Sequence, residues 1–246
     1  MLSKYEAFSQ MADNAARQVT GSYQNWTAFL QTAARLYKYP YHEQLMIYAQ
    51  RPDATACADF DFWNEKMGRY VRKGSKGIAL IDTSGERPRL RYVFDVSDTE
   101  SKKNGRRVNP WALTEGSVPA VAEMLAQNYS VEAGSDLREQ IEAITAQLAD
   151  EYWATNRTDI LGILADSFLA GYDEYSVGMS YRTAVSVSAA YAIMSRCGLD
   201  PEQYFRHEDF LNVFDWSTPN TAAAIGTAAS GIAQQVLRQI EVEARK

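Results

Sequence analysis

The sequence predicts an α+β protein in which N-terminal helices and a small antiparallel β-sheet precede a mostly α-helical C-terminal part. Apolar residues recur at helical spacing along residues 3–67 and again after about residue 115. Between these stretches, residues 69–96 contain short β-branched and aromatic runs that are separated by glycine-bearing turns. Such turns are too short for the crossover that parallel strands need, so the strands are expected to be antiparallel.

Four helices are expected before the strands. Pro40 separates the second expected helix from the third, and Pro52 ends the third, because the residue before a proline avoids helical angles. Asp59 is a candidate cap for the last of the four, and Gly68 is its expected stop. The expected helices span residues 3–19, 25–38, 41–50 and 60–67.

The strands are expected next, and each is bounded by turn residues. The segment Lys73–Gly77 and the segment 83–86 both read as turns. Residues 97–110 are polar and contain glycine and proline, which predicts a mobile loop. The expected strands span residues 69–71, 77–82 and 90–96.

The chain after residue 115 is expected to be helical throughout. Gly198 and Pro201 mark the end of one helix, and a stripe of small residues in the last helix predicts close core packing. The loop at 97–115 divides the chain into two expected domains, residues 1–110 and 111–246. The expected helices lie near residues 117–128, 135–154, 158–171, 179–197, 207–214 and 219–243.

Composition places the chain among ordinary globular proteins. It has 246 residues, of which 46% are hydrophobic and 23% charged. No apolar run approaches the roughly 18 residues of a membrane span, and the N-terminus has no apolar signal core. Cys57 and Cys197 lie far apart and fit no metal spacing, which favours free thiols. We therefore expect a cytoplasmic protein without a membrane segment.

Charge is distributed unevenly along the chain. The formal net charge is −6, but residues 63–107 carry 12 basic and 6 acidic side chains. Residues 108–246 carry 8 basic and 19 acidic side chains. This asymmetry is typical of a local anion-binding face, although a solvated basic surface gives the same pattern.

Motifs of common enzymes are absent from the sequence. His42 and His207 do not extend to H-E-x-x-H, and the chain has no G-x-S-x-G, G-x-G-x-x-G or P-loop motif. Asp95 and Asp98 are candidates to hold a metal, to pair with nearby arginines or to cap a turn. We expect no enzymatic activity, no cofactor and no resident metal.

The basic segment supplies candidate residues for binding phosphates. Cations and flexible glycines crowd around one turn, where backbone N–H groups can approach an anion closely. Three arginines occupy alternate positions of an expected strand, so they share one face, and Leu90, Tyr92 and Phe94 are expected to point to the core. The candidate residues are Arg69, Arg72, Lys73, Gly74, Lys76, Gly77, Arg87, Arg89 and Arg91.

Single-stranded nucleic acid also needs aromatic rings on which bases stack. Trp63 and Tyr70 lie among the charges, and Tyr39 and Tyr41 lie upstream. Trp63 is at helical spacing with apolar neighbours, which is also typical of a core residue, and Tyr70 is equally able to point inward. Trp63 and Tyr70 are the stacking candidates.

Several segments together resemble a known family. They are Trp26-x-x-Phe29-Leu30, Gln50-Arg51-Pro52, Trp63, Gly68-Arg-Tyr-Val71-x-Lys73-Gly74-Ser-Lys76-Gly77-Ile78 and Phe94-Asp95-Val96. Over about residues 20–100 the chain resembles the N-terminal domain of ArdC-type antirestriction proteins. The resemblance implies binding of single-stranded DNA, carried over onto Arg69, Val71, Lys73, Gly74, Lys76 and Gly77.

The whole chain is also similar to the leading segment of multidomain proteins of Firmicutes conjugative and integrative elements. It departs from the ArdC type because it has no H-E-x-x-H motif, so no peptidase activity is implied. The leading hypothesis is a non-enzymatic module of a mobile genetic element that binds single-stranded DNA. Its partners would be that DNA and element-encoded proteins or downstream domains.

Two alternatives remain open at this point. In the first, the acidic helical half docks a protein partner or imitates the charge of DNA, and the basic segment pairs internally with it. In the second, the chain is a metal-dependent nuclease or a fragment of a helicase or methyltransferase protein, which requires carboxylates clustered near Asp95 or Asp98.

Overall fold

Three helices open the chain, and the residues just before them explain where they begin. The computed structural model describes residues 3–85, 87–132 and 136–246. Helix α1 (Lys4–Val19) has a capping box between Ser3 and Glu6, and α2 (Tyr23–Arg35) is capped by the Ser22 hydroxyl. Helix α3 (Tyr41–Gln50) follows Pro40 directly. The helix boundaries predicted here agree with the structure within three residues.

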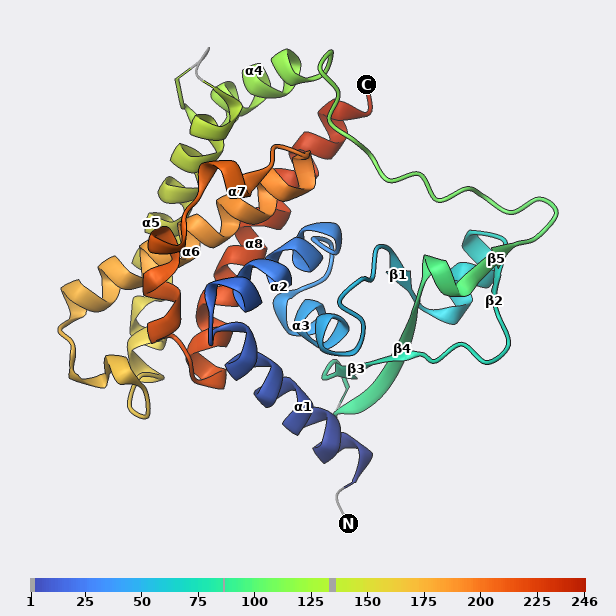
Figure 1. Ribbon diagram of the computed structural model, residues 1–246, viewed down its shortest axis with the longest axis horizontal. Helices are drawn as coiled ribbons and strands as arrows, with labels where there is room; N and C mark the ends of the chain where they lie inside the picture. Colours follow the sequence, from blue (N-terminus) through green and yellow to red (C-terminus); the bar gives the residue numbers. More distant parts are fainter. Residues whose placement is uncertain (1–2, 86, 133–135) are drawn as a thin grey trace.

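The β region comes next and contains two small antiparallel sheets. One has the strand order β1–β4–β3, and the other pairs β2 with β5 (Figure 1). A short π-helix, η1, and a 3₁₀ turn, η2, lie between the strands. The bounds are β1 Cys57–Ala58, η1 Phe62–Lys66, β2 Arg69–Val71, β3 Ile78–Asp82, β4 Arg89–Asp95, η2 Val96–Asp98 and β5 Thr99–Ser101.

Helices make up the rest of the described chain. Helix α6 (Glu174–Cys197) runs through the middle of this bundle, packed against α5 and α8 (Figure 1). Asp173 caps its start, and Gly198 ends it with a φ of 74°. The other bounds are α4 Val118–Tyr129, α5 Leu137–Gly162, η3 Phe168–Gly171, α7 Pro201–Tyr204, η4 His207–Asp215 and α8 Pro219–Ala244.

One hydrophobic core joins the N-terminal helices to the C-terminal ones. Trp26 and Phe29 of α2 and Tyr41 of α3 belong to the same buried cluster as Tyr181 and Ile240 of the helical half. The boundary expected at residues 110 and 111 therefore does not separate two hydrophobic cores. A second, smaller cluster joins α3 to β3 and β4 and contains Leu36, Met46, Ile47, Ala54, Ile78, Leu80 and Val93.

The α+β fold class is confirmed, whereas three local predictions were wrong. The helix expected at 135–154 and the start of the one expected at 158–171 form a single helix, α5, because its apolar side stays buried through Ile160; α5 ends at Gly162, and the 3₁₀ turn η3 follows at Phe168–Gly171. The loop expected at 97–110 contains β5, which pairs with β2 and takes β2 out of the larger sheet. The helix expected at 60–67 is the five-residue η1. Residues 86 and 135, which belong to an expected turn and an expected helix, lie outside the described residues.

Within the described residues, no helix combines the length and the apolar character that crossing a membrane requires.

Candidate nucleic-acid interface

The turn between β2 and β3 presents the free cations of the basic segment. Lys73 and Lys76 are exposed, and neither forms an ion pair with any residue that the structure describes. Arg72 is also exposed, and its guanidinium donates to the carbonyl of Ser97. Gly74 has a φ of 91°, a conformation that disfavours any side chain. The turn therefore holds three cations at the surface, with none of them paired to the acidic helices.

Gly77 has a packing role in this turn. A Cβ added there would lie 3.1 Å from Cβ of Tyr92 and 3.2 Å from the Phe94 ring. The absence of a side chain at Gly77 lets the Tyr92 ring lie beside the turn, and 44% of Tyr92 stays exposed. The exposed Tyr92 ring therefore lies beside Gly77, the residue that follows Lys76.

Arg69 and Tyr70 lie on β2 but differ in their availability. Arg69 is half-buried, with Nε 2.7 Å from Oγ1 of Thr99 and Nη2 3.2 Å from the Thr99 carbonyl. It therefore ties β2 to β5. Tyr70 is 43% exposed and donates its hydroxyl to Glu100, and this hydrogen bond raises the pKa of the phenol. Tyr70 is therefore available to a ligand, whereas the Arg69 guanidinium is engaged with Thr99.

The expected orientation of β4 was wrong. Val93 and Asp95 are buried, and Arg89 and Arg91 lie on the same side of the strand as they do. Arg91 forms an ion pair with Glu43 of α3 at 2.6 Å, and Arg89 forms one with Asp82 at 2.8 Å. Tyr92 faces outward instead.

The three arginines of this segment do not make one free basic face. The strand register places Arg89 opposite Asp82 and Val93 opposite Ile78, and this pairing decides which residues face the core. Arg87 is exposed and precedes the strand, and no ion pair joins it to a described residue. Arg87 is thus the member of the three that is available to an anion.

Trp63 is not a stacking surface. It is 2% exposed, and its Nε1 donates to the Phe94 carbonyl at 2.8 Å. A base cannot stack on a ring that the protein already covers, so the prediction of Trp63 as a stacking residue was wrong. The alternative that its helical spacing with Met67 indicated, a position in the core, is correct.

Two further exposed aromatics lie next to this surface and were missed by sequence reasoning. Phe60 is 50% exposed and Phe62 is 45% exposed, at the start of the η1 turn. The backbone of η1 packs on β2. The alternation of Phe60 and Phe62 with Asp59 and Asp61 was the available signal, since flanking carboxylates keep a segment in solvent.

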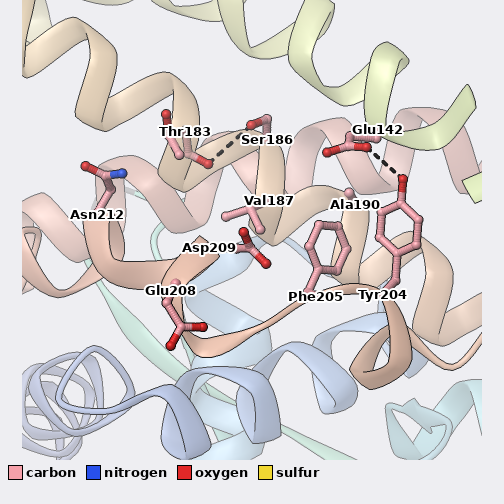
Figure 2. Close-up of a pocket in the computed structure, with 10 residues that line it drawn as sticks. All are labelled: Glu142, Thr183, Ser186, Val187, Ala190, Tyr204, Phe205, Glu208, Asp209 and Asn212. Carbon is pink, nitrogen blue, oxygen red and sulfur yellow. Dashed lines mark hydrogen bonds between the residues drawn. The ribbon is translucent and has the colours of Figure 1, made fainter. Parts of the chain in front are cut away.

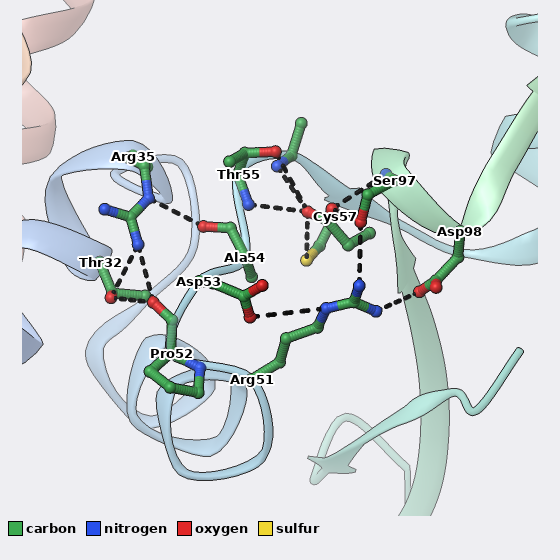
Figure 3. Close-up of polar contacts among 12 residues, drawn as sticks. Thr32, Arg35, Arg51, Pro52, Asp53, Ala54, Thr55, Cys57, Ser97 and Asp98 are labelled. Carbon is green, nitrogen blue, oxygen red and sulfur yellow. Dashed lines mark hydrogen bonds and ion pairs between the residues drawn. The ribbon is translucent and has the colours of Figure 1, made fainter.

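The two carboxylates that were candidate metal ligands, Asp95 and Asp98, bind protein partners, and Figure 3 shows Asp98 beside Arg51. Asp95 accepts hydrogen bonds from the N–H groups of Thr55, Ala56 and Ser97 at 2.7–2.9 Å. These bonds and that from the Ser97 hydroxyl outweigh the effect of burial, so the pKa of Asp95 is lowered. Asp98 forms an ion pair with Arg51 at 2.5 Å. Arginine pairing and turn capping, both named as possibilities, are what these residues do.

The described residues contain no group of three or more histidine, cysteine or acidic side chains arranged to hold a metal ion. The nuclease alternative requires such a cluster near Asp95 or Asp98.

The helical half carries a hollow of the opposite charge (Figure 2). It has a volume of about 410 Å³ and lies between α6, η4 and the end of α7. Glu142, Glu208 and Asp209 border it, together with the Tyr204 hydroxyl that donates to Glu142 at 2.8 Å. Phosphates are repelled by this surface, so it is not part of the candidate interface.

No family model, curated protein or solved structure matches this chain. The resemblance to the ArdC-type domain accordingly stays a prediction that depends on the residues quoted for it.

Proposed function

We propose that the β region binds single-stranded DNA in service of a mobile genetic element, as an antirestriction or transfer function requires. The observation that carries the proposal is the combination of unpaired cations and exposed rings on the β region, with Lys73 and Lys76 before β3 and Arg87 at the other end of the β3–β4 pair. Lys73, Lys76 and Arg87 supply charge for phosphates, and Tyr70 and Tyr92 supply faces for bases. Phe60 and Phe62 extend the aromatic surface beside β2.

Free cations distinguish this proposal from internal charge pairing. If the basic segment existed to neutralise the acidic helices, Arg72, Lys73 and Lys76 would pair with those helices. Among the described residues, the ion pairs of the helical half join residues within it or involve Lys38. The three cations of the turn remain available to an external anion.

The test is fluorescence anisotropy with a labelled single strand of about 20 nucleotides and the matching duplex, at two salt concentrations. The variant carries Lys73→Glu and Lys76→Glu. The matched control carries Lys4→Glu and Arg238→Glu, two exposed cations of the helices, and it changes the net charge by the same amount.

We expect the turn variant to weaken single-strand binding about tenfold or more, with a log–log salt slope of about −0.7 per phosphate contact in the unmodified protein. The control variant should bind as the unmodified protein does. Absence of binding to both DNA forms at low salt, or equal losses in the two variants, would overturn the proposal.

Base stacking has its own matched pair of variants. Replacing Tyr92 by alanine is expected to weaken single-strand binding about five-fold to 100-fold, the cost of one lost stacking contact. Tyr175→Ala removes a ring that is 74% exposed on α6 and should leave binding unchanged. Equal affinity of the Tyr92→Ala protein and the unmodified protein would remove Tyr92 from the site.

A second candidate function rests on the end of the helical hairpin formed by α5 and α6. Phe168, Tyr172 and Tyr175 are 64%, 50% and 74% exposed, and Met179 is 46% exposed on the same stretch. Residues 157–174 carry one arginine against four carboxylates. An apolar patch with an acidic rim fits a protein partner that presents apolar side chains within a basic segment.

An amphipathic peptide of leucine and lysine is the probe for this second function. The double variant Phe168→Ser and Tyr175→Ser should weaken binding of the fluorescent peptide, whereas Phe60→Ser, in the β region, should not. Equal binding by all three proteins would exclude this patch as the docking surface.

A further inference from the structure

A cavity of about 250 Å³ lies where the N-terminal and C-terminal parts of the chain meet. Its walls come from the α2–α3 connection, the residues around β1, the linker 108–111 and the last turns of α6 and α8. Arg35, Thr55 and Cys57 at one side of it appear in Figure 3. It is separate from the turn at residues 72–77 and from the acidic hollow of Figure 2.

The lining of this cavity is strongly basic although the chain as a whole is acidic. Four cations border it, and a single carboxylate, that of Glu241, opposes them. Asp53 and Asp95 act on Arg35 from outside the lining. The cations are Arg35, Lys38, Arg196 and Arg245.

Two of these cations are held in place by backbone carbonyls and not by carboxylates. Arg35 donates from Nε to the Ala54 carbonyl at 2.9 Å and from Nη2 to the Pro52 carbonyl at 2.7 Å. Arg196 donates from Nη2 to the Trp111 carbonyl at 2.7 Å, and its guanidinium lies 3.8 Å from the centre of the Trp111 ring. Nη1 of both arginines has no hydrogen-bond partner among the described residues.

Arg196 is half-buried, which makes its positive charge costly in the absence of a counter-ion, and this burial lowers the pKa of its guanidinium. Arg35 is exposed to solvent, and partial desolvation lowers the pKa of its guanidinium against the opposing effect of Asp53 and Asp95. An anion in the cavity would offset this cost and would use the free Nη1 groups, because a guanidinium suits the two oxygens of a carboxylate or phosphate.

The single carboxylate of the lining is already engaged. Glu241 accepts hydrogen bonds from Tyr37, Lys38 and Arg245, and although burial raises its pKa, these bonds lower it to about 2. The Cys57 thiol is neutral because burial raises its pKa to about 12. The lining therefore keeps a surplus of three positive charges at neutral pH.

The remaining walls are apolar and aromatic. Tyr37 and Trp111 are only 4% and 6% exposed, so the accessible apolar surface comes from Tyr39, Val108 and Pro110. We propose that this cavity binds a small organic anion, whose carboxylate or phosphate group contacts Arg35 and Arg196 and whose apolar part packs against Tyr39, Val108 and Pro110. The proposal does not depend on DNA binding, since Lys73, Lys76 and Tyr92 are outside the cavity.

The test is calorimetric titration with four probes: adenosine monophosphate, benzoate, inorganic phosphate and the uncharged adenosine. We expect adenosine monophosphate or benzoate to bind, and whichever binds more tightly shows whether the cavity prefers a phosphate or a carboxylate group. Uncharged adenosine should bind more weakly than either. Arg196→Gln should weaken binding about tenfold or more, as the loss of a charged hydrogen-bond donor does.

Variants with opposite expected signs keep the test decisive if Arg196→Gln does not fold. Arg245→Gln, at a side chain that is 45% exposed, should weaken binding, whereas Glu241→Gln should strengthen it, because it removes the only negative charge of the lining. Arg157→Gln, on the surface of α5, is the control and should have no effect.

Two results would overturn the proposal. One is the absence of binding by both organic anions up to about 1 mM. The other is equal affinity of the unmodified protein, Arg245→Gln and Glu241→Gln for the anion that binds.

Discussion

The helical core and the β region are held together by different interactions. In the helical core, Trp26 and Trp216 are fully buried, and each donates its indole N–H to a serine of α6, at 2.9 and 3.0 Å. In the β region the buried cluster is small, and side chains bond directly to the backbone. The Gln50 amide accepts a hydrogen bond from the Ala79 N–H and donates one to the Ala79 carbonyl, so these backbone groups on the open edge of β3 are paired.

The difference between these two regions explains how the β region keeps free cations at its surface. Its strands are joined by a few polar side chains, among them Gln50, Asp95 and Arg69. Lys73, Lys76 and Arg87 are exposed and form no ion pair with a described residue. In the helical core, stability comes from buried apolar area. Substitutions that change the volume of a buried side chain should therefore have the largest effects on stability there.

The largest expected effect is on the helical core. Trp26→Ala should lower the free energy of unfolding by about 3–5 kcal/mol, because it leaves a large cavity and removes the indole donor to Ser188, whose hydroxyl keeps its own bond to the Ala184 carbonyl. Chemical denaturation followed by circular dichroism measures this. Phe168→Ala, at a ring that is 64% exposed, is the control, and an equal loss there would contradict the volume argument.

A glycine of α8 tests the same core by adding volume. A Cβ at Gly226 would lie 2.1 Å from Cε2 of Tyr41, so Gly226→Ala should destabilise the protein by about 3 kcal/mol despite the higher helix propensity of alanine. At Gly231 of the same helix nothing lies within 4 Å, so Gly231→Ala should stabilise by about 0.5–1 kcal/mol. Thermal denaturation measures both variants, and a shift of the melting temperature in the same direction for both would contradict this prediction.

Asp95 tests the polar bonding of the β region. Asp95→Asn should lower the free energy of unfolding by about 2 kcal/mol at pH 7, since a carboxylate with several donors is lost. The pKa of Asp95 is lowered in the folded protein, so its contribution is present above the unfolded pKa of about 3.9 and is lost as pH falls through the folded value.

Denaturation at a series of pH values checks this dependence. The difference between the unmodified protein and Asp95→Asn should shrink as the pH is lowered below about 4. A difference that stays constant across this range would mean that the carboxylate charge does not contribute.

The smallest expected effects on stability are those of Arg91→Gln and Arg87→Gln, which should differ from each other. Arg91→Gln removes the ion pair with the mostly buried Glu43 and should cost about 1 kcal/mol. Arg87→Gln should change the stability by less than about 0.5 kcal/mol and should instead weaken binding to single-stranded DNA. The same denaturation and anisotropy measurements, applied to both variants, check this division.

The sequence by itself determined the fold class and most helices of this protein. Helical periodicity, Pro40, Pro52 and Gly198 are local signals, and they placed α1, α2, α3 and the end of α6 close to their observed bounds. The crowding of Lys73 and Lys76 around a flexible Gly74 is local as well, and the structure finds that turn where the sequence predicted it.

Only the tertiary structure decided which residues of the strands face the core. The pairing of β4 with β3 and the bonds to Asp95 turn Val93 inward and Tyr92 outward, and neither partner is adjacent in sequence. Burial of Trp63, the shared core of α2 and α6 and the basic cavity at Arg196 likewise depend on contacts between distant segments. Periodicity reports that a strand has two faces, but the choice between them is made by what packs against each face.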